Sequence, residues 1–211
     1  MALGVSLVIV MWTWKQGREI LLQHLHEDDP KLEDFVNSIA RDKKIRVERT
    51  AVFLCANPDS VPQALMHNLK HNQVLHQTNL ILTVEFLDVP VVTKEQRLHI
   101  KEIGSGFWKI ILHYGFMETP DIPKALEDCK IDNVTTGNVK VNNFMIDPFT
   151  TSYFISRETV ISGPNIPNQS GKMAKWRDEL FAVMSRNAGS VVGYFNIPSN
   201  SVIELGSRVH I

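Results

Sequence analysis

The chain has 211 residues, of which 44% are hydrophobic and 21% are charged. This composition is typical of a globular protein that buries a core, and it excludes a disordered or fibrous one. The formal net charge of -1 gives the whole molecule no attraction for nucleic acid, so no nucleic-acid partner is expected. Its two cysteines, Cys55 and Cys129, form no close pair, which suits a reducing compartment.

Residues 1–14 form an apolar run without a single charge, and two tryptophans close it. The run is too short to cross a bilayer, which takes about 20 residues. A signal peptide would begin with positive charge, and a buried core helix would rarely end on paired tryptophans. The pattern favours the last part of a transmembrane helix. In that interpretation Trp12 and Trp14 lie in the interfacial aromatic belt, and Lys15 and Arg18 are the cytoplasmic anchors.

We therefore expect three segments: residues 1–14 as the end of a transmembrane helix, residues 15–49 as a helical connector, and residues 50–211 as a cytosolic domain. Within the connector, Asp29 and Pro30 are typical of a helix start, and apolar residues follow at helical spacing. A basic cluster then predicts a solvated helix end and loop, with contact to anionic lipid headgroups as the alternative. Its members are Arg41, Lys43, Lys44, Arg46 and Arg49.

Residues 50–55 and 80–84 are short, continuous apolar runs that predict strands buried on both faces. A helix from Ser60 to about residue 74 separates them, so the three elements predict a βαβ unit with parallel strands. Residues 98–103 and 107–114 then predict a β-hairpin around the Gly104-Ser105-Gly106 turn.

The remaining elements are a short helix, a polar loop, a strand, an amphipathic helix and a terminal extended segment. They are expected at residues 121–129, 131–143, 151–156, 171–187, and 202–205 with 208–211. The amphipathic helix should bury one side and end near Gly189; that side carries Met173, Trp176, Leu180, Val183 and Met184. The predicted fold class is α/β, a mostly parallel sheet with flanking helices and a β-hairpin, preceded by the transmembrane helix end.

One turn is a candidate ligand site, because it follows the first parallel strand and leads into a helix. It contains Asn57, Asp59, Ser60 and Gln63. Ligands of open α/β sheets bind at the carboxyl ends of strands, and a helix N-terminus receives phosphate. Ser60 and Gln63 also match a capping box, so a purely structural turn is the alternative.

No catalytic or metal site is predicted, and no cofactor. His67 and His71 could share a helix face, but Asn68 stands where a zinc protease needs glutamate. Asp147, Arg157 and Glu158 could form an acid–base group, although structural ion pairs are the commoner explanation for such a trio. A hydrolase would need a nucleophile or metal that the motifs do not supply.

Several long blocks resemble one family. Residues 50–76, 106–126 and 147–159, together with Trp176-Arg177 and residues 180–211, are similar to the cytosolic C-terminal domain of Kup-type potassium uptake transporters (the KUP/HAK/KT family). Residues 11–19 also resemble the end of that family's last transmembrane helix. One departure is Glu48-Arg49, where family members commonly carry Pro-Gly.

The resemblance implies a regulatory and assembly domain of a proton-coupled potassium transporter at the inner (plasma) membrane, with the domain on the cytoplasmic side. It also implies a fold like that of universal stress proteins, a homodimer, and contact with the transporter's own membrane bundle and, at residues 1–14, with the lipid bilayer. No potassium-binding residue is expected in this chain. The alternative is a nucleotide-sensing α/β module that regulates a membrane protein and takes a nucleotide effector at the 57–63 turn.

Overall fold

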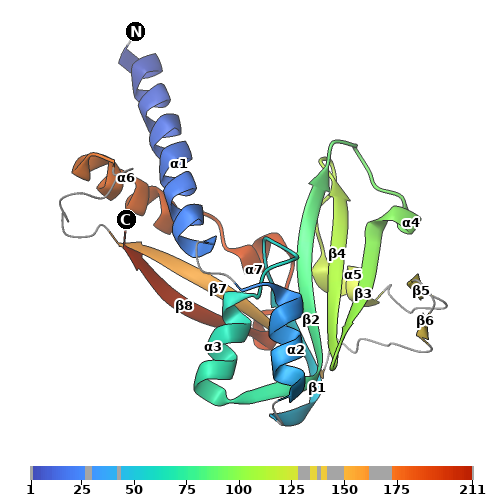
Figure 1. Ribbon diagram of the computed structural model, residues 1–211. Helices are drawn as coiled ribbons and strands as arrows, with labels where there is room; N and C mark the ends of the chain where they lie inside the picture. The colour runs from blue at the N-terminus through green and yellow to red at the C-terminus, as the bar shows by residue number, and fades with distance from the viewer. Residues whose placement is uncertain are drawn as a thin grey trace. The chain divides into compact units, whose positions relative to one another are not determined.

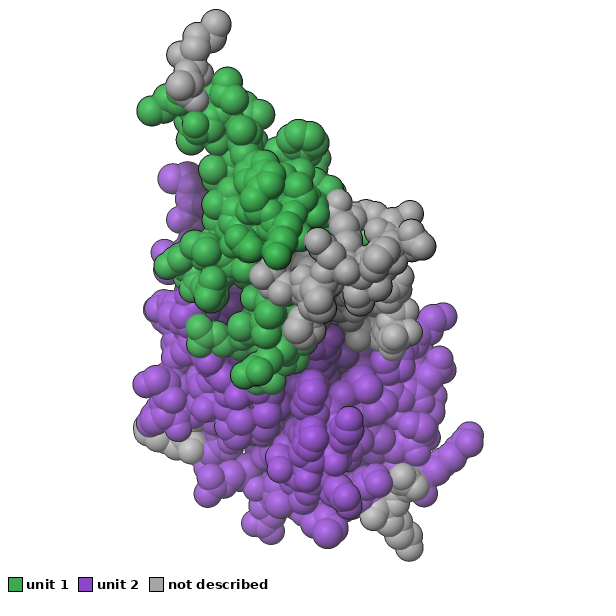
Figure 2. All heavy atoms as spheres, turned by 90° about the vertical axis from the view of Figure 1, so that its left-hand side faces the viewer, with its two compact units in different colours: residues 1–29, 157–189, 206–211 green, residues 30–156, 190–205 purple. Residues whose placement is uncertain are grey.

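The chain forms two compact units in the computed structural model (Figure 1). The structure describes residues 2–26, 30–41, 44–127, 134–136, 139–141, 150–161 and 173–210. Unit 1 contains residues 1–29, 157–189 and 206–211, and unit 2 contains residues 30–156 and 190–205; Figure 2 colours them separately. Each unit is described by itself below.

A six-stranded sheet organises the fold, in the order β3-β4-β2-β1-β7-β8. Its strands are β1 (Ile45–Leu54), β2 (Val74–Leu87), β3 (Leu98–Gly104), β4 (Phe107–Gly115), β7 (Thr151–Ile161) and β8 (Val202–His210). The β1–β2, β1–β7 and β2–β4 pairs are parallel, and the β3–β4 pair is antiparallel. The predicted α/β class, the βαβ unit and the hairpin are therefore confirmed.

Both faces of this sheet are covered in unit 2. Its helices are α2 (Leu32–Arg41), α3 (Gln63–Asn72), α4 (Lys94–Arg97), α5 (Ile122–Glu127) and α7 (Val191–Tyr194), with a 3-10 turn η2 (Ser199–Ser201). Along β1, Ala51 and Phe53 face the cluster beneath α2 and α3, while Val52 faces the cluster on the side of α5. This period-two alternation is the geometry of a strand, and apolar residues on both sides explain why the run is continuous.

Strand boundaries differ from the predicted ones in β1, in β2 and in the predicted 131–143 loop. β1 begins at Ile45, so Arg46 and Arg49 lie in a strand and not in a loop. β2 begins at Val74, directly after α3. The predicted 131–143 loop contains a two-stranded sheet of β5 (Val134–Thr136) and β6 (Val139–Val141). Backbone pairing in these segments does not depend on an apolar pattern, so the pattern could not predict it.

Arg49 has a φ of 138°, a backbone conformation that favours glycine, and the β1–β2 register shifts between Val47 and Thr50. This is the position where the resembling family commonly carries glycine. In this chain the strand keeps its irregularity although arginine stands in place of glycine, so the backbone at Arg49 is strained.

The hairpin turn needs its second glycine for space. Gly106 has a φ of 76°, and a Cβ there would lie 2.3 Å from the carbonyl oxygen of Gln77. Ser105, between the two glycines, also has a positive φ of 51°. The turn therefore brings the β4 start against β2 as closely as backbones allow.

Unit 1 is built around a helix pair, α1 (Ala2–His26) and α6 (Lys175–Arg186). One stripe of α1, spaced four residues apart, is buried: Thr13, Gly17 and Leu21. A Cβ at Gly17 would lie 2.4 Å from Phe181 Cδ2, so the missing side chain is what lets the Phe181 ring approach the α1 backbone.

The predicted buried side of the last long helix was right for Met173, which is buried, and for Met184, which packs against the unit 1 cluster, but wrong for Trp176 and Val183. α6 buries Asp178, Phe181 and Ala182, whereas Trp176 and Val183 are exposed. Apolar residues stand on both sides of this helix, so spacing alone could not say which side would pack. The helix ends at Arg186, close to the predicted end, but Asn187 caps it through its backbone amide and Gly189 does not.

Candidate functional site

The predicted interface anchors lie on the exposed surface of α1. Trp12 is 61% exposed and Trp14 is 38% exposed, and Lys15 and Arg18 are exposed as well. Before them, seven large apolar side chains are 36–78% exposed: Leu3, Val5, Leu7, Val8, Ile9, Val10 and Met11. Within the described part of the chain, no helix is long and apolar enough to cross a membrane.

α6 contacts α1 where the tryptophans stand. The Arg177 Nε donates a hydrogen bond to Thr13 Oγ1 at 3.0 Å, and its guanidinium lies 4.7 Å from the centre of the Trp12 ring. Trp14 packs on Phe181 with ring centres 5.5 Å apart. Two of the four predicted anchors are therefore tied to α6, which the sequence pattern did not indicate.

The predicted ligand turn closes on itself. The Ser60 hydroxyl donates to the Asn57 carbonyl at 3.2 Å, and the Asp59 amide donates to Asn57 Oδ1 at 3.0 Å. The helix cap is Pro62 and no side chain caps it, so the predicted capping box of Ser60 and Gln63 is absent. Proline fixes the backbone at the helix start and leaves Ser60 to stabilise the turn instead.

Asp59 is the charged group of this turn, and Lys109 on β4 lies 2.5 Å from its carboxylate. The hydrogen bond from Lys109 and its positive charge lower the pKa of Asp59. The Asp59 carbonyl also accepts from the Leu32 amide at 3.0 Å, so the turn positions the start of α2. These contacts give Asn57, Asp59 and Ser60 structural roles, and ligand binding there stays a prediction.

The other candidates form no reactive group in the residues that the structure describes. His67 and His71 stack with ring centres 6.0 Å apart, but no cluster of three metal-ligating side chains occurs in that part of the chain. Asp147, Cys129 and the predicted Asp29 cap lie outside the described residues. Cys55 Sγ is 3.3 Å from Thr83 Oγ1, in keeping with a partly buried core residue.

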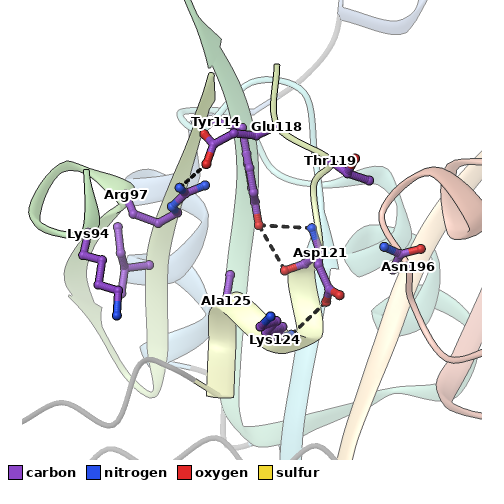
Figure 3. Close-up of a pocket in the computed structure, with 10 residues that line it drawn as sticks. Lys94, Arg97, Tyr114, Glu118, Thr119, Asp121, Lys124, Ala125 and Asn196 are labelled. Atoms are coloured by element: carbon purple, nitrogen blue, oxygen red, sulfur yellow. Dashed lines mark hydrogen bonds and ion pairs between the residues drawn. The ribbon is translucent and has the colours of Figure 1, made fainter. Parts of the chain in front are cut away.

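A pocket of about 580 Å³ lies in unit 2 beside the carboxyl end of β4 (Figure 3). Its volume is within the range of small-molecule sites. The lining side chains come from α4, β3, β4, α5 and the segments after β4 and α7: Lys94, Arg97, Leu98, Tyr114, Glu118, Thr119, Asp121, Lys124, Ala125 and Asn196.

An ion pair between Arg97 and Glu118 forms one wall, and both side chains are largely buried. Arg97 also donates to the Val92 carbonyl at 3.0 Å and lies over the Tyr114 ring, 4.7 Å from its centre. Glu118 accepts from the amides of Gly115 at 2.7 Å and Val92 at 3.1 Å. Burial would raise the pKa of Glu118, but Arg97 and these two amides together lower it.

Tyr114 forms the floor through a reciprocal pair of hydrogen bonds. Its hydroxyl donates to the Asp121 carbonyl at 3.0 Å and accepts from the Asp121 amide at 3.2 Å. The Asp121 carboxylate in turn accepts from the Lys124 amide at 3.0 Å, at the start of α5. Burial raises the pKa of Tyr114, so the phenol stays protonated.

Gly115 lets the chain turn into this pocket. A Cβ there would lie 2.3 Å from the Pro90 carbonyl oxygen, and the Phe116 and Met117 amides donate to the Val89 and Pro90 carbonyls. The segment after β2 is thereby held against the segment after β4.

The arrangement suits binding and not catalysis. Glu118 is held ionised and Tyr114 protonated, so neither can exchange a proton near neutral pH. Lys94 and Lys124 give the lining one more cation than it has anions, which favours a small anion. This pocket was not predicted, because the strand-end rule was applied only after the first strand. The same rule applied after residues 107–114, with the polar stretch 117–124, would have indicated it.

Comparison with known proteins gives one consistent family. Residues 48–211 match the K+ potassium transporter C-terminal domain. The chain is 50% identical over 211 residues to "Probable potassium transport system protein Kup 2" of Albidiferax ferrireducens, covering 100% of this chain and 31% of that protein. It is 45% identical over 208 residues to "Probable potassium transport system protein Kup" of Pseudomonas aeruginosa, covering 99% of this chain and 30% of that protein. No solved structure matches, so the likeness to universal stress proteins stays a prediction.

Proposed function

The chain belongs to the K+ potassium transporter C-terminal domain family, and from this we propose that it is the cytosolic regulatory and assembly domain of a proton-coupled potassium uptake transporter. The family is one of transport proteins and not of enzymes. The chain spans about 30% of the length of the curated relatives it matches, so the membrane part of such a transporter would be its main partner. The observation that carries the proposal is the match over the whole chain.

The bare apolar part of α1 supports the membrane side of the proposal. Seven exposed large apolar residues within a nine-residue stretch of one helix, Leu3 to Met11, are a poor fit to water and a good fit to lipid. Residues 1–14 would then end a transmembrane helix, residues 15–49 would connect, and residues 50–211 would lie in the cytoplasm. Lys15 and Arg18 would stand on the cytoplasmic side of the inner membrane.

A route for regulation follows from the α1–α6 contact. α1 packs on α6 through its stripe of Thr13, Gly17 and Leu21. A shift of α1 in the membrane would therefore displace α6. Two packings of such a helix pair would provide the two states that a regulatory domain needs. A homodimer, which the family resemblance implies, would contain two such helix pairs.

Deletion of residues 45–211 from a full-length transporter tests this proposal. We expect rubidium uptake, or its response to external potassium, to change while the amount of protein in the membrane stays the same. A transporter with Gly17→Val should show part of the same change, because it disturbs the α1–α6 contact. Gly4→Val, where an added Cβ meets nothing within 4 Å in this chain, is the matched control. Unchanged uptake in the deletion under potassium-rich and potassium-poor conditions would contradict a regulatory role.

The Lys94–Lys124 pocket favours a second, compatible function, the sensing of a small anionic effector such as a nucleotide. Its volume and its cations support this reading over the 57–63 turn, where Asp59 would repel an anion. Calorimetry with adenine nucleotides tests it. Loss of binding in Lys94→Ala with Lys124→Ala, but not in Ser60→Ala, would place the effector in the pocket, and the reverse pattern would place it at the turn. Absence of binding to the unchanged chain would contradict both.

A further inference from the structure

The first turn of α6 has the composition of a membrane-interface anchor. Trp176 is 56% exposed, the neighbouring Lys175 is exposed, and Arg177 follows. A tryptophan flanked by cations is typical of the headgroup layer, where the ring meets the acyl boundary and the charges meet phosphate. Composition alone places no residue at a membrane, so the depth of this turn has to come from the structure.

Contacts with α1 supply that depth. Arg177 lies 4.7 Å from the centre of the Trp12 ring and 3.0 Å from Thr13 Oγ1, so the first turn of α6 stands level with the tryptophans that close the apolar run. An α-helix rises about 1.5 Å per residue, which puts Leu3 roughly 14 Å from Trp12 along α1. That length covers about half of the apolar thickness of a bilayer.

We infer that the segment Lys175–Arg177 lies in the lipid headgroup layer as a second interfacial anchor, with Trp176 among the lipids. This inference rests on the proposed membrane location of α1. If Leu3 to Met11 lie in lipid, Trp12 lies at the membrane interface. Arg177 stacks on Trp12, so the first turn of α6 lies at the interface as well. Anionic headgroups complement the exposed Lys15 and Lys175, which favours lipid over an apolar protein surface as the occupant.

Fluorescence quenching by lipids measures this location. The 211-residue chain would be reconstituted into vesicles of phosphatidylcholine and phosphatidylglycerol, with and without bromine on the lipid acyl chains. Variants that keep one tryptophan each, with the other three changed to phenylalanine, report separately on Trp12, Trp176 and Trp108. Trp108 on β4 is the matched control, because it packs against the core of unit 2.

The expected result is a loss of Trp176 fluorescence comparable with the loss for Trp12, and none for Trp108. Lys175→Glu should reduce the loss at Trp176 and leave the loss at Trp12 unchanged, because it weakens only the α6 anchor. Quenching of Trp12 without quenching of Trp176 would overturn this inference and leave the proposed function standing. No quenching of either would overturn both, and equal quenching of all three would overturn the inference as non-specific association.

Discussion

The β1–β2 core of unit 2 and the first half of α1 in unit 1 are both rich in apolar side chains, but they differ in how far these are exposed. Ala51, Val52 and Phe53 on β1 are 0% exposed, as are Leu80 and Ile81 on β2. The apolar side chains before Trp12 on α1 reach 78% exposure. The strands pack against apolar clusters on both faces, whereas the side chains from Leu3 to Met11 on α1 stay exposed. Apolar sequence therefore calls for an apolar surrounding but does not say whether protein or lipid supplies it.

The largest effect should come from opening the unit 2 core. Phe53 is fully buried and stacks on Phe154 with ring centres 4.7 Å apart. Phe53→Ala should lower the free energy of unfolding by about 3–5 kcal/mol, measured by urea denaturation in detergent. Leu7→Ala, on the exposed part of α1, is the control and should change it by less than about 0.5 kcal/mol. Equal losses in the two variants would erase the contrast between the regions.

The helix pair of unit 1 should respond to added volume at one position only. Gly17→Val forces atoms into the Phe181 ring and should cost about 1–3 kcal/mol, seen as a lower thermal midpoint. Gly4→Ala meets nothing within 4 Å and should stabilise the helix by up to about 1 kcal/mol. If Gly17→Val were as stable as the unchanged chain, the α1–α6 packing would be wrong.

Acid should weaken unit 2 through Glu118. Because folding lowers the pKa of this carboxyl, its stabilisation is complete above the ordinary glutamate range and is lost as the pH falls below it. Glu118→Gln should cost about 1–2 kcal/mol at neutral pH, since Arg97 and two amides lose a charged acceptor. The difference between the two proteins in urea denaturation should shrink from pH 7 towards pH 3, and a constant difference would contradict the ion pair.

The smallest effect should be a gain. Arg49→Gly removes the strain of the positive φ and should raise the free energy of unfolding by about 1 kcal/mol. Arg46→Gly is the counterpart on the same strand and should destabilise, because Arg46 donates to the carbonyls of His76 and Ser105 at 3.2 and 2.8 Å. If both changes stabilised the protein, the gain at residue 49 could not be assigned to relief of backbone strain.

Much of the fold was predictable because its signals are local. The continuous apolar runs at 50–55 and 80–84 predicted two-faced strands, and the glycines at 104 and 106 predicted the hairpin. The start of β1 was not predictable, because Arg46 and Arg49 are exposed and the backbone pairing of residues 45–47 with β2 leaves no pattern in the side chains. The buried side of α6 was not predictable either. Trp176 and Phe181 are both apolar, but Phe181 is buried and Trp176 is exposed.

The amino-acid sequence by itself determined the α/β class, the family and the apolar character of the first helix, because these depend on composition, spacing and long similar blocks. Only the tertiary structure decided that Gly17 receives Phe181, that Arg177 meets Trp12, and that Arg97, Tyr114 and Glu118 form one pocket. These contacts join residues far apart in the chain, and the geometry that brings them together arises only when the helices and strands have packed.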